Sequence, residues 1–211
     1  TDAMDVSALE FALKAGADAV DGLPEGTQLL ILGEMGIGNT TLASAMSASL
    51  LGCSAQDMVG PGTGVSGEAL SAKRKLVTAA LKRTQGCDDP LEVLRRLGGR
   101  EIASIVGAMG RAAERGIAVL IDGFIVSSAA LVAVRLEPKI RDYFWFGHRS
   151  AEPGHERILA ALNAQPLVDA GLRLGEGSGA LTALPLVQAA VALHNEMATF
   201  EQASVPDREE S

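Results

Sequence analysis

The stretch LLILGEMGIGNTT, residues 29–41, contains an apolar run, a glycine-rich loop and the start of a helix. The run Leu29–Leu32 is continuous and apolar, which is typical of a buried strand in a parallel sheet. Three glycines in the loop let the backbone turn tightly and approach a ligand. Asn39, Thr40 and Thr41 are predicted to cap the helix that follows. Because a helix N-terminus presents free backbone N–H groups, the stretch predicts an α/β fold with an anion site at this loop.

Two familiar glycine motifs fit this loop only in part. As a P-loop it has Asn39 where the phosphate-binding lysine belongs, and as a dinucleotide fingerprint it has Thr41 at the third glycine position. Glu34 fits neither motif, because its carboxylate would face the phosphates of a polyanionic nucleotide. A ligand with one phosphate plus hydroxyls, or with a developing positive charge, suits Glu34 better. A tight strand-to-helix turn that binds nothing remains an alternative for the loop taken alone.

Composition limits the classes of protein that the chain can represent. Its 211 residues are 47% hydrophobic, which suits one α/β domain over residues 1–203, followed by a flexible tail at residues 204–211. The formal net charge of −8 argues against nucleic acid as a partner, since no basic stripe is available to displace counterions. No apolar run approaches the roughly 20 residues of a membrane span. Cys53 and Cys87 lack the spacing of metal ligands, and we expect a cytoplasmic location with no membrane partner.

Strands and helices alternate along the chain in the manner of βα units. Apolar runs predict strands at residues 29–32, 117–121 and 141–146, with a further strand expected just before a second glycine loop, at residues 172–174. Helical periodicity or uniform apolar character predicts helices at residues 5–20, 101–115, 124–136, 153–162 and 180–200. We therefore predict a three-layer α/β/α fold with a mainly parallel, Rossmann-like sheet.

The second glycine loop, GEGSG at residues 175–179, places Glu176 between glycines as the first loop places Glu34. Ligands bind at the carboxyl ends of parallel strands, so both carboxylates should lie at that edge, together with Asp122, which follows residues 117–121. Carboxylates gathered in a partly desolvated pocket have raised and separated pKa values, which suits a general base. Each acid alone is explained as well by charge complementarity to a helix N-terminus. Three acids at one edge favour catalysis.

Five motifs in this chain resemble those of the nicotinate-nucleotide–dimethylbenzimidazole phosphoribosyltransferase family. They occur in the family's order over nearly the whole chain: GEMGIGNTT at 33–41, DGFI at 122–125, HRSAEPGH at 148–155, LGEGSGA at 174–180 and LHNEMATFEQA at 193–203. Such enzymes move the phosphoribosyl group from nicotinate mononucleotide to 5,6-dimethylbenzimidazole, giving α-ribazole 5′-phosphate and nicotinate for the lower ligand of cobalamin. The resemblance implies these two small-molecule substrates.

The resemblance also implies roles for individual residues. Glu176 matches the catalytic base that takes the proton from the benzimidazole nitrogen, and Glu34 matches the acid near the ribose and the reacting centre. Gly36, Gly38, Lys73 and Ser150 match positions on the phosphate side of the substrate. We also expect four further residues to bind substrate: Asn39, Asp122, Gly175 and Gly177. Lys73 would supply the cation that the incomplete P-loop lacks. The reaction implies no cofactor and no metal.

One departure from the family lies at the beginning of the chain. Family members carry a sizeable stretch before the helix at residues 5–20, and it contributes to the benzimidazole pocket and to dimer contacts. We therefore expect a weakened homodimer and poor affinity for the base, whose pocket is incomplete or supplied by another chain. Two alternatives remain open: transfer to another acceptor such as adenine or a phenol, and a chain that binds mononucleotide without turnover.

His148 and His155 flank Glu152, which hints at a metal site. Their spacing fits no helical pair of histidines, and Pro153 and Gly154 interrupt the segment. We interpret both histidines as hydrogen-bonding residues that order the loop, and we predict no metal there.

Overall fold

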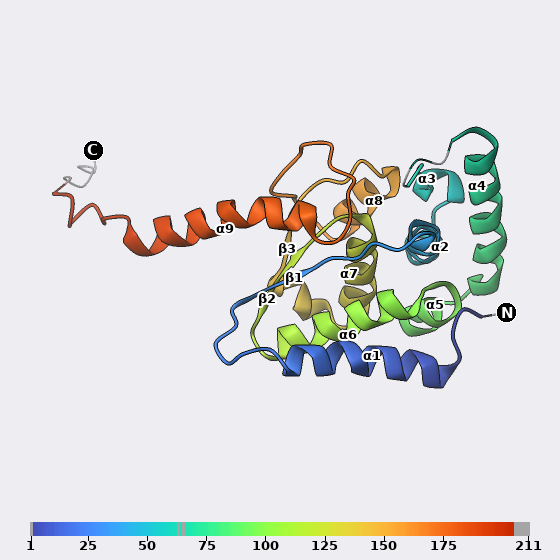
Figure 1. Cartoon of the computed structure of the whole chain (residues 1–211), viewed down its shortest axis with the longest axis horizontal. Coiled ribbons are helices and arrows are strands. Elements are labelled where there is room, and N and C mark those ends of the chain that lie inside the picture. The colour runs from blue at the N-terminus through green and yellow to red at the C-terminus, as the bar shows by residue number, and fades with distance from the viewer. Residues whose placement is uncertain (1, 63, 65, 205–211) are drawn as a thin grey trace, which may run out of the picture.

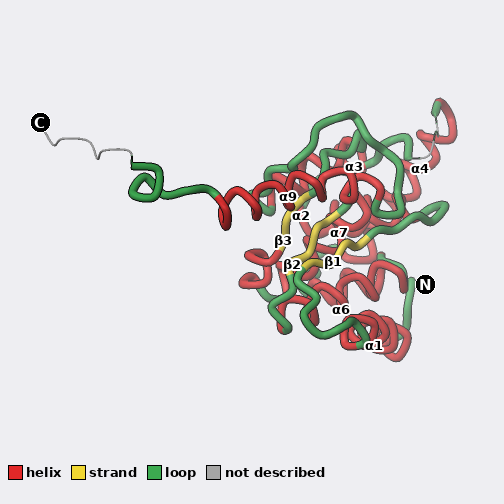
Figure 2. Tube along the Cα trace, turned by 60° about the vertical axis from the view of Figure 1, so that its left-hand side comes forward, coloured by secondary structure: helices red, strands yellow, loops and turns green. Residues whose placement is uncertain are grey.

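A computed structural model describes residues 2–62, 64 and 66–204. Its sheet consists of β1 (Leu29–Leu32), β2 (Ala118–Ile121) and β3 (Phe144–Phe146), in the order β1-β2-β3. Both pairs of neighbours are parallel, with Ile31 opposite Leu120 and Leu120 opposite Trp145. The strands lie together within a largely helical molecule (Figure 2). A parallel sheet among helices confirms the predicted α/β class.

One face of the sheet packs on a buried helical layer. Val119, Ile121 and Phe146 point to this face and are almost fully buried, because α6 (Arg100–Glu114) and α7 (Phe124–Leu136) cover it. The outer helix α1 (Val6–Asp21) runs alongside α6 (Figure 1). α7 is buried on nearly every face, as its uniform apolar sequence predicts.

The remaining helices lie beyond the carboxyl ends of the strands, on the side of the molecule away from the projecting end of α9 (Ser178–Glu196) (Figure 1). They are α2 (Asn39–Leu51), α3 (Ala55–Met58), α4 (Gly67–Leu81), α5 (Pro90–Leu97) and α8 (Pro153–Ala161), with 3₁₀ turns η1 (Lys82–Thr84) and η2 (Pro138–Tyr143). Asp89 caps α5 and Pro90 begins it, as predicted from the sequence. This group of helices carries the first glycine loop on the N-terminal side of α2.

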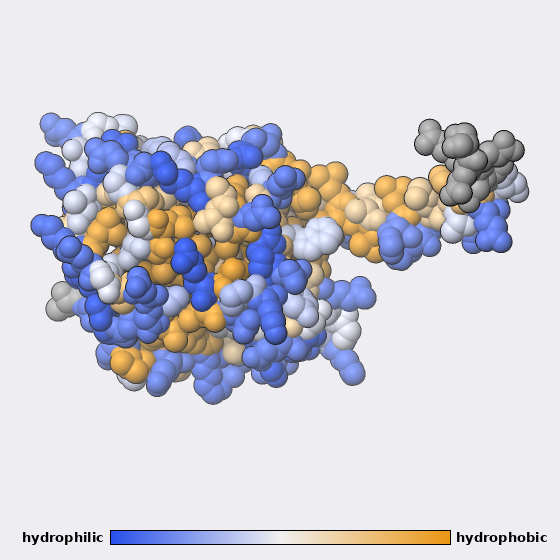
Figure 3. Space-filling model, turned by 180° about the vertical axis from the view of Figure 1, so that it is seen from behind, coloured by the Kyte–Doolittle hydropathy of each residue, from blue (hydrophilic) through white to orange (hydrophobic). Residues whose placement is uncertain are grey.

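α9 (Ser178–Glu196) lies at the other face of the sheet and projects away from the rest of the molecule (Figure 1). Ile31, Ala118 and Trp145 line a groove with residues of α9 such as Val187 and Val191. Beyond that groove the helix stays exposed, and its surface is largely hydrophobic (Figure 3). Four of its larger apolar side chains are more than half exposed: Leu181, Leu186, Val191 and Leu193. Within the described residues, no helix is both long and apolar enough to cross a membrane.

Two predicted strands differ from the structure. Residues 141–146 form a strand only from Phe144, because Pro138 and the Glu137 side chain, which accepts a hydrogen bond from the Lys139 N–H, start a 3₁₀ turn. Residues 172–174 are irregular. The chain instead pairs with the end of β3 earlier, where the N–H of Leu167 donates to the Phe146 carbonyl and that of Val168 to the Gly147 carbonyl.

Two predicted helix ends also differ. α2 begins after Gly38, whose φ is 99°, and has no side-chain cap, so Asn39, Thr40 and Thr41 do not cap it. The Asn39 amide instead donates a hydrogen bond to the Glu34 carboxylate. α9 ends at Glu196 instead of residue 200. Of the tail predicted at residues 204–211, only residue 204 is among those that the structure describes.

Candidate active site

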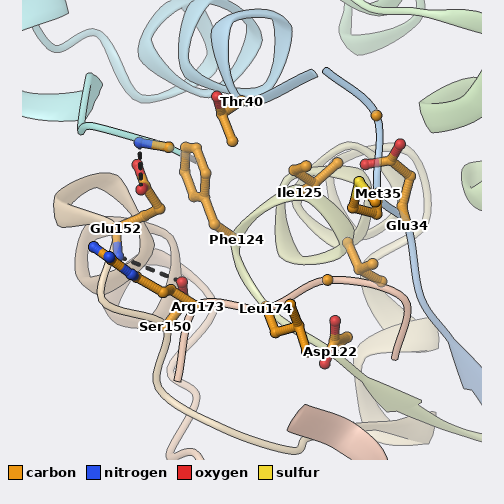
Figure 4. A pocket seen from close by; sticks show the side chains of 15 residues that line it. Glu34, Met35, Thr40, Asp122, Phe124, Ile125, Ser150, Glu152, Arg173 and Leu174 are labelled. Atoms are coloured by element: carbon orange, nitrogen blue, oxygen red, sulfur yellow. Dashed lines mark hydrogen bonds between the residues drawn. The ribbon is translucent and has the colours of Figure 1, made fainter. Parts of the chain in front are cut away.

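A pocket lies at the carboxyl ends of the strands, between the first glycine loop, the start of α7 and the loop before α8. Glu34 and Met35 lie on one side of it, and Ser150, Glu152 and Arg173 lie on the other (Figure 4). Phe124 and Ile125, at the start of α7, supply apolar wall between these groups. The pocket therefore combines an apolar surface with acidic, hydroxyl and cationic groups, which is typical of a site for a small polar ligand.

The two glycine loops touch through their backbones. The N–H of Glu176 donates to the carbonyl of Glu34 over 3.3 Å. Gly33 allows this approach, since a Cβ at that position would lie 2.1 Å from the nitrogen of Gly177. Glu176 itself has φ of 66°, a conformation that non-glycine residues rarely adopt and that often marks functional sites. The prediction that both glutamates lie at one edge is consistent with this contact, although no strand precedes the second loop in the described structure.

Asp122, at the end of β2, holds the second loop in place through hydrogen bonds. Its side chain is almost fully buried, and its two carboxylate oxygens accept hydrogen bonds from the N–H groups of Gly177 at 3.2 Å and Ala180 at 2.9 Å. His148 Nε2 lies 3.3 Å from the same carboxylate. Burial alone would raise the pKa of Asp122, but these neighbours together hold the pKa below its usual value. Asp122 therefore stays ionised and holds the start of α9 against the sheet.

Glu34 has one satisfied and one unsatisfied carboxylate oxygen. Oε1 accepts a 2.6 Å hydrogen bond from Asn39 Nδ2, whereas Oε2 is buried without a partner among the described residues. Burial raises the pKa of Glu34, the Asn39 hydrogen bond opposes that rise, and the charge of Glu101 adds to it. A carboxylate with an unpaired oxygen in a residue of the pocket wall is suited to accept a hydrogen bond from a hydroxyl group or, when ionised, to stabilise positive charge.

Lys73 reaches the first loop from α4. Its Nζ donates to the Thr40 hydroxyl at 2.9 Å and to the Gly60 carbonyl at 3.0 Å. Burial lowers the pKa of Lys73, and the nearby charge of Glu152 opposes that shift. Glu152 in turn accepts a hydrogen bond from the Gly62 N–H. The third ammonium hydrogen of Lys73 has no acceptor in the described part of the chain, so a phosphate oxygen near Thr40 would complete its hydrogen bonding.

His155 orders the loop that carries Ser150. The backbone N–H of Ser150 donates to His155 Nδ1 at 2.9 Å, so the ring hydrogen must sit on Nε2, which lies 2.9 Å from the Ser127 hydroxyl. Burial lowers the pKa of His155 to about 3, which keeps the ring neutral. This geometry agrees with our interpretation of His155 as an ordering residue. Within the described residues, no three His, Cys, Asp or Glu side chains gather as a metal site would require.

The residues predicted to form the site separate into two sets. The wall of the pocket includes Glu34, Gly36, Asp122, Ser150 and Gly175. The others lie behind or beside that wall in the described structure: Gly38 at the start of α2, Asn39 behind Glu34, Lys73 behind Thr40, and Glu176 and Gly177 in the second loop. Glu176 is exposed and adjoins Gly175, which lines the pocket.

Sequence reasoning missed Arg173 and the apolar pair Phe124 and Ile125. Arg173 lines the pocket opposite Glu34 and is exposed (Figure 4). Its position two residues before the second glycine loop was the available signal, because that loop was expected at the same edge of the sheet as the first loop. Phe124 and Ile125 were assigned to a buried helix, but the first turn of α7 also faces the pocket.

Comparison with known proteins extends over the whole described chain. A family model described as a phosphoribosyltransferase, DBI_PRT, matches residues 1–205. The nicotinate-nucleotide–dimethylbenzimidazole phosphoribosyltransferase of Pseudomonas putida (strain F1) is 53% identical over 209 residues, which are 98% of this chain and 59% of that protein. The protein of the same name from Pseudomonas syringae pv. syringae is 55% identical over 208 residues, again 98% and 59% of the two chains. The chain therefore spans about three fifths of the length of these relatives.

A solved structure shows the same arrangement of elements. CobT from Thermus thermophilus is 45% identical to this chain and superposes with a TM-score of 0.93, over 98% of this chain and 62% of that one. At this level of identity the similarity concerns both sequence and fold, and its span includes the two glycine loops that form the pocket.

Proposed function

The chain belongs to the phosphoribosyltransferase family DBI_PRT, and on that premise we propose that it transfers a phosphoribosyl group from nicotinate mononucleotide to 5,6-dimethylbenzimidazole. The products are α-ribazole 5′-phosphate and nicotinate. The observation that carries the proposal is the 3.3 Å backbone contact between Glu176 and Glu34, because it joins two carboxylate-bearing loops at the carboxyl ends of the strands. General acid–base work and stabilisation of a sugar cation both need carboxylates at one site.

In the proposed reaction the unprotonated ring nitrogen of the benzimidazole attacks the anomeric carbon of the ribose. The bond from that carbon to the nicotinate nitrogen breaks, and its electron pair turns the pyridinium into a neutral ring. Glu176 accepts the proton from the other benzimidazole nitrogen. Glu34 stabilises the oxocarbenium-like ribose between the two bases. Attack on the face opposite the leaving group inverts the anomeric carbon from β to α.

The phosphate of the mononucleotide would lie at the start of α2. We assign its contacts to the backbone at Gly36 and Gly38, to Lys73 and to Ser150. Lys73 supports this assignment because its ammonium already contacts Thr40, which lines the pocket. Gly175, Gly177, Asp122 and Asn39 complete the site by shaping the loops that carry the two glutamates. Arg173 adds a cation on the same wall as Ser150.

Liquid chromatography with mass detection of α-ribazole 5′-phosphate, made from the two substrates by the purified chain, tests the proposal. Product formed with dimethylbenzimidazole supports it. Product formed only with adenine or a phenol would favour the first alternative, in which the phosphoribosyl group is transferred to another acceptor. Binding of nicotinate mononucleotide with no product from any acceptor would favour the second alternative, a binding chain without turnover.

We expect Lys73→Met to weaken binding of nicotinate mononucleotide by about one to two decades, because a charge-assisted hydrogen bond to phosphate is worth about 1.5–3 kcal/mol. Methionine keeps most of the apolar stem that Lys73 buries on α4. Calorimetric titration measures the effect, with nicotinate riboside, which lacks the phosphate, as the control ligand. Equal losses for both ligands would show that Lys73 serves the fold and not the phosphate.

We also propose that the chain forms a homodimer, supported by the exposed apolar side chains of α9. Analytical ultracentrifugation over a concentration series measures the association. A chain that stays monomeric at every concentration would contradict this proposal. The cytoplasmic location stays a prediction.

A further inference from the structure

Asn39 stands at the position where a P-loop would have its lysine, and its side chain points to a protein carboxylate. It is the first residue of α2 and only 6% exposed. Its Nδ2 donates to Glu34 Oε1 over 2.6 Å, across the turn of the loop. An ionised carboxylate can only accept, so the amide must present its NH₂ group to Glu34. The contact is therefore a directed hydrogen bond.

Gly36 makes room for this pair. A Cβ at position 36 would lie 2.5 Å from Asn39 Nδ2 and 2.8 Å from Glu34 Oε1. The N–H of Asn39 also donates to the Gly36 carbonyl at 3.1 Å, which closes the turn. The loop thus folds around the hydrogen bond between the two side chains, and this hydrogen bond explains why position 36 is a glycine.

The second carboxylate oxygen of Glu34 is left free by this arrangement. Oε2 is buried and has no partner among the described residues, while the Glu34 side chain lines the pocket. A buried acceptor without a donor is costly unless a ligand or water supplies one. The neutral amide of Asn39 fixes the carboxylate without cancelling its charge, which a lysine at position 39 would do.

We propose that Asn39 is a positioning residue that holds Glu34 through Oε1 and so leaves Oε2 to accept a hydrogen bond from a hydroxyl group of the bound sugar. This role rests on the proposed function for the identity of the ligand. It differs from the direct contact between Asn39 and the substrate that the family resemblance implies.

Several charged groups surround Glu34. Glu101 acts on it from α6, Glu176 approaches through the second loop, and Asp122, Glu152 and Arg173 share its pocket. Replacing Asn39 leaves these charged groups in place but removes the hydrogen bond that favours the ionised form of Glu34. The pKa of Glu34, already raised by burial, should therefore rise further.

The test compares Asn39→Leu with the wild type in two measurements. Carbon-detected NMR of ¹³C-labelled glutamate carboxylates follows the titration of Glu34, and steady-state kinetics follow the pH dependence of kcat/KM. We expect the Glu34 midpoint to move up by about one to two pH units, the range of a charge-assisted hydrogen bond. Because Glu34 acts ionised, the acidic limb of kcat/KM should move up with it.

Ser47→Ala is the matched control. Ser47 is a fully buried polar residue of the same helix, and its hydroxyl has no partner in the described structure, so its loss should leave the Glu34 titration unchanged. Asn39→Ser serves as a second variant if the leucine disturbs folding, because its shorter side chain cannot span the distance to Glu34. Both Asn39 variants should shift the midpoint in the same direction.

The outcomes separate this role from the proposed function. An unchanged Glu34 midpoint in a folded Asn39 variant overturns the positioning role. An unchanged midpoint with weakened mononucleotide binding would instead assign Asn39 to direct substrate contact. If the wild type makes no α-ribazole phosphate but the NMR midpoint still shifts, the hydrogen bond holds Glu34 as described and the proposed function is what fails.

Discussion

Glu176→Gln is expected to lower turnover by about 10²- to 10⁴-fold, the usual effect of removing a general base. The amide keeps the size and shape of the carboxylate but cannot accept the benzimidazole proton. Binding of nicotinate mononucleotide should stay close to that of the wild type, because the backbone contact of residue 176 with the Glu34 carbonyl does not depend on its side chain.

Single-turnover kinetics with product identified by mass measure this effect, and calorimetry measures mononucleotide affinity. Glu25→Gln, at an exposed position outside the pocket wall, is the control for a glutamate-to-glutamine change that should leave both quantities unchanged. Turnover near the wild-type value in Glu176→Gln would remove Glu176 from the role of base. A comparable loss of mononucleotide affinity would show that residue 176 binds the donor substrate.

Gly33→Ala is expected to lower turnover by an amount within the range given for Glu176→Gln, although it adds only a methyl group. The new Cβ would lie 2.1 Å from the Gly177 nitrogen and 2.4 Å from the carbonyl carbon of Glu176, both backbone atoms that cannot rotate away. The second loop must move, and a displacement of about 1 Å at a catalytic group can cost on the order of 10²-fold in rate. Forced repacking of this kind also costs about 1–3 kcal/mol in stability.

Thermal unfolding and turnover measure the two parts of the prediction. Gly110→Ala is the control, because no atom of a neighbouring element lies within 4 Å of its added Cβ and the residue lies inside α6. There the same substitution should stabilise the helix by about 0.5–1 kcal/mol and leave turnover unchanged. Wild-type turnover and stability in Gly33→Ala would mean that the two loops are not packed as the structure has them.

Elements with clear end signals were predicted well from the sequence. α7 runs from Phe124 to Leu136 as expected, because Gly123 precedes it and Pro138 prevents its continuation. β1 was predicted correctly for a related reason, since an apolar run followed directly by a glycine leaves few alternatives. The strand predicted at residues 141–146 was too long, because the run of aromatics concealed a 3₁₀ turn that begins at Pro138.

Part of the pocket wall could be predicted from the sequence, but the contacts between its residues could not. The rule that ligands bind at strand ends was enough to bring Glu34 and Asp122 to one edge. The partner of Asn39 was not predictable, because it depends on how the short loop folds over Gly36. The anchoring of the second loop by Asp122 joins groups 55 and 58 residues apart, and no local pattern carries such information. The catalytic and binding roles of these residues stay predictions.

The close packing of the two glycine loops also limits how the site can be redesigned. A side chain at position 33 would meet the backbone of the second loop, and one at position 36 would meet the paired side chains of Asn39 and Glu34, so variation at either position would disturb the site. The apolar side chains of the wall that are not buried in the core are Met35, Ile125 and Leu174. Substitutions at these three apolar positions would change the shape of the pocket without disturbing the packing of the two glycine loops.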